Sequence, residues 1–156
     1  MKVTFILNEK IVSVDVEHSK RLLDVLRQDF NMTSVKEGCG EGECGSCSVL
    51  LNDMLVNSCL IPILYVEGSR IVTLEGYRES ERFEAIKKGF EECGSVQCGY
   101  CTPGIILAAE ALLAAHPNPS EEEVIKGIEG NLCRCTGYHM IIQGILAAKE
   151  IGKGLW

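Results

Sequence analysis

The residues of this chain with the greatest capacity for chemistry are its nine cysteines, in 156 residues. Eight of them form two sets of four. The first set has the spacing C-x4-C-x2-C-x11-C and consists of Cys39, Cys44, Cys47 and Cys59. The second set has the spacing C-x2-C-x31-C-x-C and consists of Cys98, Cys101, Cys133 and Cys135. Thiolates bind zinc and iron–sulfur clusters, so the two sets predict two metal centres.

The first set has the spacing of plant-type 2Fe–2S ferredoxins, C-x4-C-x2-C with a distant fourth cysteine. The loop that carries it contains four glycines, Gly38, Gly40, Gly42 and Gly45. Glycine lets the backbone curl so that successive N–H groups face anionic sulfurs. A structural zinc site is the alternative, but it favours C-x2-C pairs and does not need such a loop. The pattern therefore favours an iron–sulfur cluster.

The second set is ambiguous by spacing alone, since C-x2-C suits zinc, iron–sulfur or a dithiol redox pair. C-x-C is uncommon in structural zinc sites, which place two to four residues between ligands. Thr102-Pro103 follows Cys101, and Thr136-Gly137 follows Cys135. Both read as helix starts, which would direct two positive helix ends toward one anionic centre. A second cluster is favoured over zinc.

Two further residues lie close to these sets in sequence. Cys93 is outside both sets and is interpreted as a free thiol at a helix end. His139 suggests a Rieske centre, but that centre replaces two cysteines by two histidines, and both sets already have four cysteines. His139 is therefore interpreted as a surface or helix-end residue.

The first half of the chain must position the first set, and its pattern predicts a small mixed sheet with one helix. Residues 3–7 and 11–16 read as a hairpin, and 48–51, 54–58 and 71–74 as further strands. Ser19 is expected to cap a helix over 20–30, where leucines recur at helical spacing.

The second half is helical. Helices are expected from Ser80, from Thr102-Pro103 as cap and first turn, from Ser120 with Glu123 as a capping box, and around 141–151. The boundary between the halves is expected near 76–79. We therefore predict two domains, residues 1–77 and 78–156.

Composition excludes several other classes of protein. The net charge is -7, from 15 Lys and Arg against 22 Asp and Glu, which argues against a nucleic-acid partner. No apolar run is long enough for a membrane span. Residues 1–5 show no export signal, and with an odd number of cysteines this disfavours disulfides and predicts a cytoplasmic protein.

Three motifs together resemble a specific family. They are GCGEGECGSC at 38–47, QCGYCTPG at 97–104 and GNLCRCTGY at 130–138. In this order they resemble the 2Fe–2S small subunit of the xanthine dehydrogenase and carbon monoxide dehydrogenase family of molybdenum hydroxylases. The resemblance covers the whole chain. Ser46 departs from it, because alanine is common there, and a hydroxyl at this position is expected to be able to hydrogen-bond a cluster sulfur and so raise the potential.

The resemblance implies an α+β fold: an N-terminal ferredoxin-like β-grasp domain, then a C-terminal four-helix bundle with a buried cluster. It implies an electron-transfer subunit that is not itself catalytic. Electrons would pass from a molybdopterin-binding large subunit through two 2Fe–2S clusters to an FAD-binding medium subunit. The assembly implied is a dimer of heterotrimers.

The resemblance also implies that Gln97 and Cys135 contact the molybdopterin cofactor. The second set would then lie nearest molybdenum, and the first would face the flavin from a more exposed loop. Two other functions remain open: a free two-cluster ferredoxin and a zinc-stabilised adaptor. A colourless protein with zinc but neither iron nor acid-labile sulfide would exclude both iron–sulfur functions.

Overall fold

The computed structural model describes all residues, 1–156, and its N-terminal half is a five-stranded mixed sheet in the order β2-β1-β5-β3-β4. The strands are β1 (Lys2–Leu7), β2 (Lys10–Asp15), β3 (Ser48–Leu51), β4 (Met54–Asn57) and β5 (Arg70–Val72). β1 pairs with β5 in parallel, and the other neighbours are antiparallel. This is the mixed sheet that the sequence predicted.

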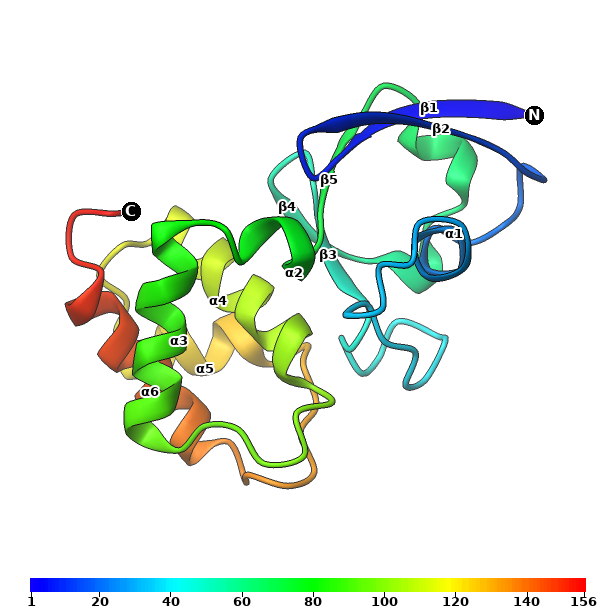
Figure 1. Ribbon diagram of the computed structural model, residues 1–156. Helices are drawn as coiled ribbons and strands as arrows, with labels where there is room; N and C mark the ends of the chain where they lie inside the picture. Colours follow the sequence, from blue (N-terminus) through cyan, green and yellow to red (C-terminus); the bar gives the residue numbers. More distant parts are fainter.

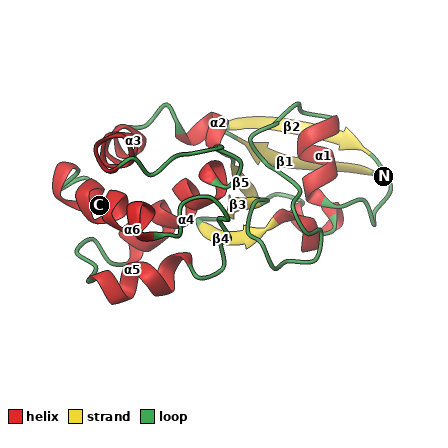
Figure 2. Ribbon diagram, turned by 90° about the horizontal axis from the view of Figure 1, so that it is seen from below, coloured by secondary structure: helices red, strands yellow, loops and turns green.

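One face of this sheet is covered by helix α1 (Leu22–Gln28), as Figure 2 shows. The helix buries Leu22 and Leu26 against Phe5 of β1 in one apolar core. α1 is shorter than the expected 20–30, and Ser19 is not its cap. The N-cap is Arg21, whose backbone is extended because it bridges to Pro62. The chain thus enters the helix from a short sheet-like pairing.

Two short 3-10 helices and one short α-helix complete this half and lead out of it. They are η1 (Ser58–Leu60), η2 (Ile63–Val66) and α2 (Leu74–Tyr77). η1 follows β4 directly, so the cysteine-bearing turn at 58–60 is attached to the edge of the sheet.

The C-terminal half is a bundle of four helices, as predicted (Figure 1). They are α3 (Glu81–Cys93), α4 (Thr102–Ala115), α5 (Glu121–Ile128) and α6 (His139–Ile151). The capping box of Ser120 and Glu123 is present at α5. α4 begins at Thr102, one residue earlier than expected, with Cys101 as its N-cap. The α+β fold class is confirmed.

The two halves share apolar packing. Leu50 of β3, Val72 of β5 and Tyr77 of α2 belong to the same buried cluster as the bundle helices. The hydroxyl of Tyr77 donates to the buried carboxylate of Glu110 on α4 at 2.5 Å. Sheet and bundle are therefore joined by both apolar and polar contacts.

The same carboxylate holds the C-terminus. Arg82 of α3 donates to Glu110 at 2.8 Å, and the indole of Trp156 donates to it at 2.7 Å. The Arg82 guanidinium also lies over the Trp156 ring. A buried carboxylate needs such partners, and here they connect α2, α3, α4 and the last residue. No helix of the bundle, or elsewhere, is both long and apolar enough to cross a membrane.

Helices α3 and α6 pack backbone to backbone at Gly89. A Cβ at this position would lie 2.4 Å from the carbonyl oxygen of Gly144. Both residues are on helices, so neither backbone can yield without shifting a whole element.

We expect Gly89→Ala to destabilise the bundle by about 1–3 kcal/mol, because the added methyl overpacks this crossing. The measurement is denaturant unfolding of the metal-loaded protein. Lys88→Ala, at the exposed neighbouring position, is the control and should leave stability nearly unchanged. Equal stability of the two variants would contradict the packing argument.

Candidate iron–sulfur sites

The first cysteine set comes from two separated segments that the sheet brings together. Cys39 and Cys44 lie on the loop between α1 and β3, and Cys47 directly precedes β3. Cys59 lies on η1, after β4. Cys47 and Cys59 are buried, whereas Cys39 and Cys44 are half-buried. The pairing of β3 with β4 is what closes the distance between these segments.

Backbone N–H groups converge on one sulfur of this set. The Sγ atom of Cys39 accepts N–H groups from Glu41 at 3.4 Å, Glu43 at 3.3 Å and Cys44 at 3.4 Å. These donors stabilise the thiolate and lower the pKa of Cys39 to about 7. The loop therefore has the curled backbone that the sequence predicted around an anionic sulfur.

The glycines of this loop serve two distinct purposes. Gly40, Gly42 and Gly45 have φ angles of 71°, 82° and 71°, in the left-handed region. Gly38 has an ordinary φ, but a Cβ there would lie 2.8 Å from the Sγ of Cys44. Three glycines thus provide the curl, and the fourth leaves room for a sulfur.

The four thiols of the first set form two pairs. The thiol of Cys44 lies close enough to that of Cys39 to help lower its pKa. Burial and the neighbouring thiol of Cys47 raise the pKa of Cys59 to about 11. Thiolates crowded in this way repel one another unless cations lie between them. Two thiol pairs and a ring of amide donors fit a 2Fe–2S cluster, which takes four cysteines for two irons.

The second set is likewise assembled from two segments. Cys98 and Cys101 lie on the loop before α4, and Cys133 and Cys135 lie on the loop between α5 and α6. Burial and then the thiol of Cys133 raise the pKa of Cys101, and the thiol of Cys98 raises that of Cys135, so Cys101 neighbours Cys133 and Cys98 neighbours Cys135. Each pair joins one cysteine of C-x2-C to one of C-x-C, so both segments are needed for each half of the site.

The second set was expected to be buried within the bundle, and for the chain alone this prediction is wrong. Cys98 and Cys135 are exposed, Cys101 is half-buried, and only Cys133 is buried. In the first set, which was expected nearer the surface, no cysteine is exposed. The reason is that the second set lies at the end of the bundle, in loops before α4 and α6, rather than between the helices (Figure 1).

Thr136 is a contact that the sequence analysis missed. Its hydroxyl donates to the Sγ of Cys133 at 3.1 Å. Burial alone would raise the pKa of Cys133, but this hydroxyl and nearby N–H groups outweigh it, and the pKa is lowered. The partner Cys101 instead has its pKa raised to about 12 by burial and by Cys133. The sequence feature that could have predicted this contact is the position of Thr136, three residues after Cys133.

The expected pair of helix N-termini is present only in part. α4 begins immediately after Cys101, one residue earlier than predicted, so its N-terminus does lie at this set. α6 begins at His139, with Tyr138 as an N-cap at φ 71°, so Thr136-Gly137 is not a helix start. The hydroxyl of Thr136 supplies the donor there instead.

The two cysteine-bearing loops are in direct contact across the two halves of the chain. The N–H of Leu132, next to Cys133, donates to the carbonyl of Cys44 at 2.9 Å. The buried amide of Asn131 donates to the carbonyl of Gly45 at 3.2 Å. In Figure 1 the cyan loop after α1 and the loops before α4 and α6 lie on the same side of the molecule. The two candidate sites are therefore neighbours held by backbone hydrogen bonds.

A hollow of about 610 Å³ opens at the second set. It is lined by Ser46, Cys98, Tyr100, Cys101, Leu132, Cys133, Arg134, Cys135, Gly137 and Tyr138. All four cysteines of the second set thus face one space, together with one residue of the first loop.

The remaining predicted residues lie around these sites. Gln97 is exposed, next to Cys98, and His139 is exposed at the start of α6. Cys93 is the half-buried last residue of α3 and pairs with neither set.

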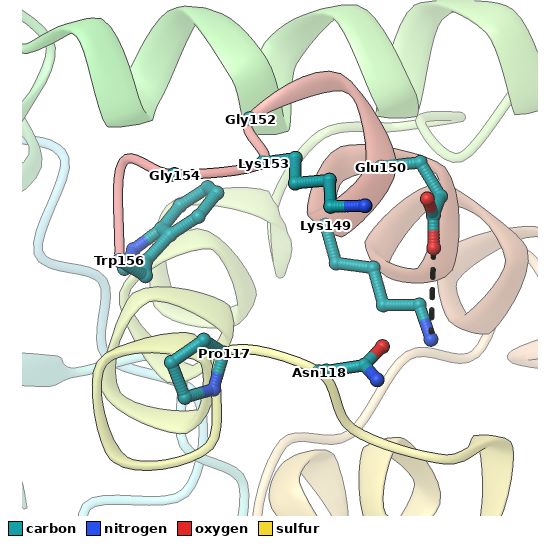
Figure 3. A pocket seen from close by; sticks show the side chains of 8 residues that line it. All are labelled: Pro117, Asn118, Lys149, Glu150, Gly152, Lys153, Gly154 and Trp156. Atoms are coloured by element: carbon teal, nitrogen blue, oxygen red, sulfur yellow. Dashed lines mark ion pairs between the residues drawn. The ribbon is translucent and has the colours of Figure 1, made fainter.

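A further hollow, shown in Figure 3, lies at the opposite end of α6 and contains no cysteine. It is lined by Pro117, Asn118, Lys149, Glu150, Gly152, Lys153, Gly154 and Trp156. Lys149 and Glu150 form an ion pair there at 3.9 Å, whereas Lys153, which also lines the hollow, has no such partner.

Comparison with known proteins assigns both halves. Residues 5–72 match the model of the 2Fe-2S iron-sulfur cluster binding domain, and residues 73–146 match that of the [2Fe-2S] binding domain. The nicotinate dehydrogenase small FeS subunit of Eubacterium barkeri is 49% identical over 144 residues, which cover 92% of each chain. The xanthine dehydrogenase iron-sulfur-binding subunit of Escherichia coli O157:H7 is 42% identical and covers 82% of each.

Solved structures agree. Quinoline 2-oxidoreductase from Pseudomonas putida 86 contains a chain that superposes with a TM-score of 0.90 at 38% identity, covering 99% of this chain and 97% of that one. The aldehyde oxidoreductase from Desulfovibrio desulfuricans superposes with a TM-score of 0.91 at 37% identity. There the match covers 98% of this chain but 17% of the other, so the same fold forms part of a longer chain.

The lowered pKa of Cys39 predicts selective alkylation of the metal-free protein. At pH 7 about half of this thiol is ionised, whereas the Cys59 thiol, with a pKa of about 11, is almost wholly protonated. We expect iodoacetamide to modify Cys39 well before Cys59, as measured by peptide mass spectrometry over time. Equal alkylation rates at Cys39 and Cys59 would contradict the conclusion that the N–H donors lower the pKa of Cys39.

Cys133→Ser and Cys93→Ala should distinguish a cluster ligand from a cysteine that binds no metal. Cys133→Ser is expected to lose one cluster, about half of the iron, and to destabilise the bundle, because the metal closes two separated loops. Cys93→Ala should keep all its iron and both electron paramagnetic resonance signals. Loss of a signal in Cys93→Ala would show that the second set is wrongly assigned.

Proposed function

This chain belongs to the 2Fe–2S small-subunit family of the molybdenum hydroxylases, and we propose that it carries electrons from a molybdopterin-binding large subunit to an FAD-binding medium subunit. It has two 2Fe–2S-binding domains and transfers electrons rather than performing the catalytic step itself. When bound, each 2Fe–2S cluster accepts and releases one electron.

The proposed ligands are the two cysteine sets: Cys39, Cys44, Cys47 and Cys59 for one cluster, and Cys98, Cys101, Cys133 and Cys135 for the other. Their support is the pairing of the thiols within each set and the N–H and hydroxyl donors around them. We propose residues 1–77 and 78–156 as the two domains, which agrees with the change from sheet to helices at α2.

The observation that carries this function is the contact between the two cysteine-bearing loops. The hydrogen bond from Leu132 to Cys44 joins a residue next to one set with a member of the other. Two metal sites that served only to stabilise the fold would not need to lie next to each other. Adjacent sites are what a relay between two partners requires.

Each site also has its own exposed apolar side chains, which suits two different partners. Val96, Tyr100 and Leu132 are exposed around the second set. Leu60, Leu64 and Tyr65 are exposed on η1 and η2, beside Cys59 of the first set. Large exposed apolar side chains beside a functional site are typical of protein interfaces.

We propose that the second set faces the molybdopterin-binding subunit, with Gln97 and Cys135 in contact with the pterin. The exposure of Gln97, Cys98 and Cys135 supports this, because a cofactor in another subunit can reach only exposed groups. The first set then faces the FAD-binding subunit. The proposed assembly is a cytoplasmic dimer of heterotrimers.

The proposal predicts that the two partners can be lost separately. Co-expressed with its large and medium subunits, Val96→Glu should fail to retain the molybdopterin-binding subunit but keep the FAD-binding one. Tyr65→Glu, at a side chain 73% exposed, should show the reverse. The measurement is affinity co-purification, with iron and acid-labile sulfide content as the control for folding.

Retention of both partners by both variants would contradict the two proposed faces. A wild-type protein that contains zinc without iron or sulfide would contradict electron transfer itself. A protein with both clusters but no stable partner would instead support a free two-cluster ferredoxin.

A further inference from the structure

Ser46 lies on the loop of one cysteine set but faces the other. In sequence it stands between Cys44 and Cys47 of the first set. It is only 6% exposed, yet it lines the hollow formed by the four cysteines of the second set. It is the one residue of the first loop that does so.

The backbone around Ser46 is held firmly in this position. Its carbonyl accepts the N–H of Lys36 at 3.0 Å. The preceding carbonyl of Gly45 accepts the amide of Asn131 at 3.2 Å. A Cβ on Gly104 of α4 would lie 2.4 Å from that same carbonyl, so the loop and the bundle are in close contact here. Ser46 is therefore presented to the second site by contacts on both sides.

The hydroxyl of Ser46 is free to donate into the hollow. It makes no hydrogen bond within the chain, although two nearby serines do. The hydroxyl of Ser48 donates to the carbonyl of Gly45, and that of Ser58 donates to the carbonyl of Cys47, each at 2.7 Å. The Ser46 hydroxyl is thus open to the hollow rather than sealed in the core without a partner, and it lies beside an anionic site.

We propose that the Ser46 hydroxyl donates a hydrogen bond to the cluster held by the second cysteine set and raises the reduction potential of that cluster. A donor to cluster sulfur stabilises the more negative, reduced form more than the oxidised one. A residue of the ferredoxin-like half thus tunes the site of the helical half. The inference rests on the proposed function, since it requires clusters at both sets.

The first set is the competing recipient of this hydrogen bond. A Cβ built on Gly38 lies 3.4 Å from the Ser46 hydroxyl and 2.8 Å from the Sγ of Cys44. The hydroxyl is thus between the two sites. The cavity that it lines favours the second set, and the experiment must therefore follow each cluster separately.

The test is a redox titration of the iron-loaded chain, with both clusters followed by electron paramagnetic resonance. Ser46→Ala removes one oxygen and adds no atom, so it should fold and bind iron as the wild type does. We expect the potential of the second-set cluster to fall and that of the first to stay unchanged. Ser46→Thr, which retains the hydroxyl, should restore the wild-type potential.

Two further variants calibrate the result. Thr136→Val removes the hydroxyl that donates to Cys133, so it should lower the second-set potential by a similar amount. Ser58→Ala removes a hydroxyl beside Cys59 that already has a carbonyl partner, so it should leave the second-set potential unchanged.

A shift of only the first-set potential in Ser46→Ala, or no shift at either set, would overturn the inference. Both results leave the iron content intact, so the proposed function would stand. A wild-type chain that holds no iron would instead contradict the proposed function, and with it this inference.

Discussion

The mutual repulsion of thiolates is the constraint on which the rest of this structure depends. Each cysteine set gathers four sulfurs that would all carry negative charge when bound to metal, and burial together with the neighbouring thiol raises the pKa values of Cys59 and Cys101. Such a grouping is stable only with cations between the sulfurs and with donors around them. Amide groups supply the donors at Cys39, and a hydroxyl supplies one at Cys133.

The sheet and the bundle bring their four cysteines together in different ways. In the sheet, the pairing of β3 with β4 brings Cys47 and Cys59 together and buries both. In the bundle, the loops before α4 and α6 meet at one end, so Cys98 and Cys135 stay exposed. The first site is thus enclosed by its own domain, whereas the second is open on one side. Of the two, only the open second site presents cysteines that a group in another protein can touch directly.

The contact between the two halves of the chain fixes the separation of the two cysteine sets. Asn131 and Leu132 hydrogen-bond to the loop of the first set, and Glu110 joins α2, α3 and the C-terminus. Two flexibly tethered domains would hold their sites at varying distances. Here backbone hydrogen bonds between the cysteine-bearing loops keep the two sites at one separation, which a relay of electrons requires.

The sequence by itself determined the two cysteine sets, the hairpin, the four helices and the capping box at Ser120, because spacing and local hydrogen bonding are properties of neighbouring residues. It also determined the curled loop around Cys39, since glycine adopts without steric cost the left-handed φ that Gly40 and Gly42 have. The tertiary structure alone decided which thiols pair, which are exposed, and that Thr136 and Ser46 face the second site. These features depend on residues far apart in sequence, such as Ser46 and Cys133, and their distance is set by the packing of the two halves, which no local pattern records.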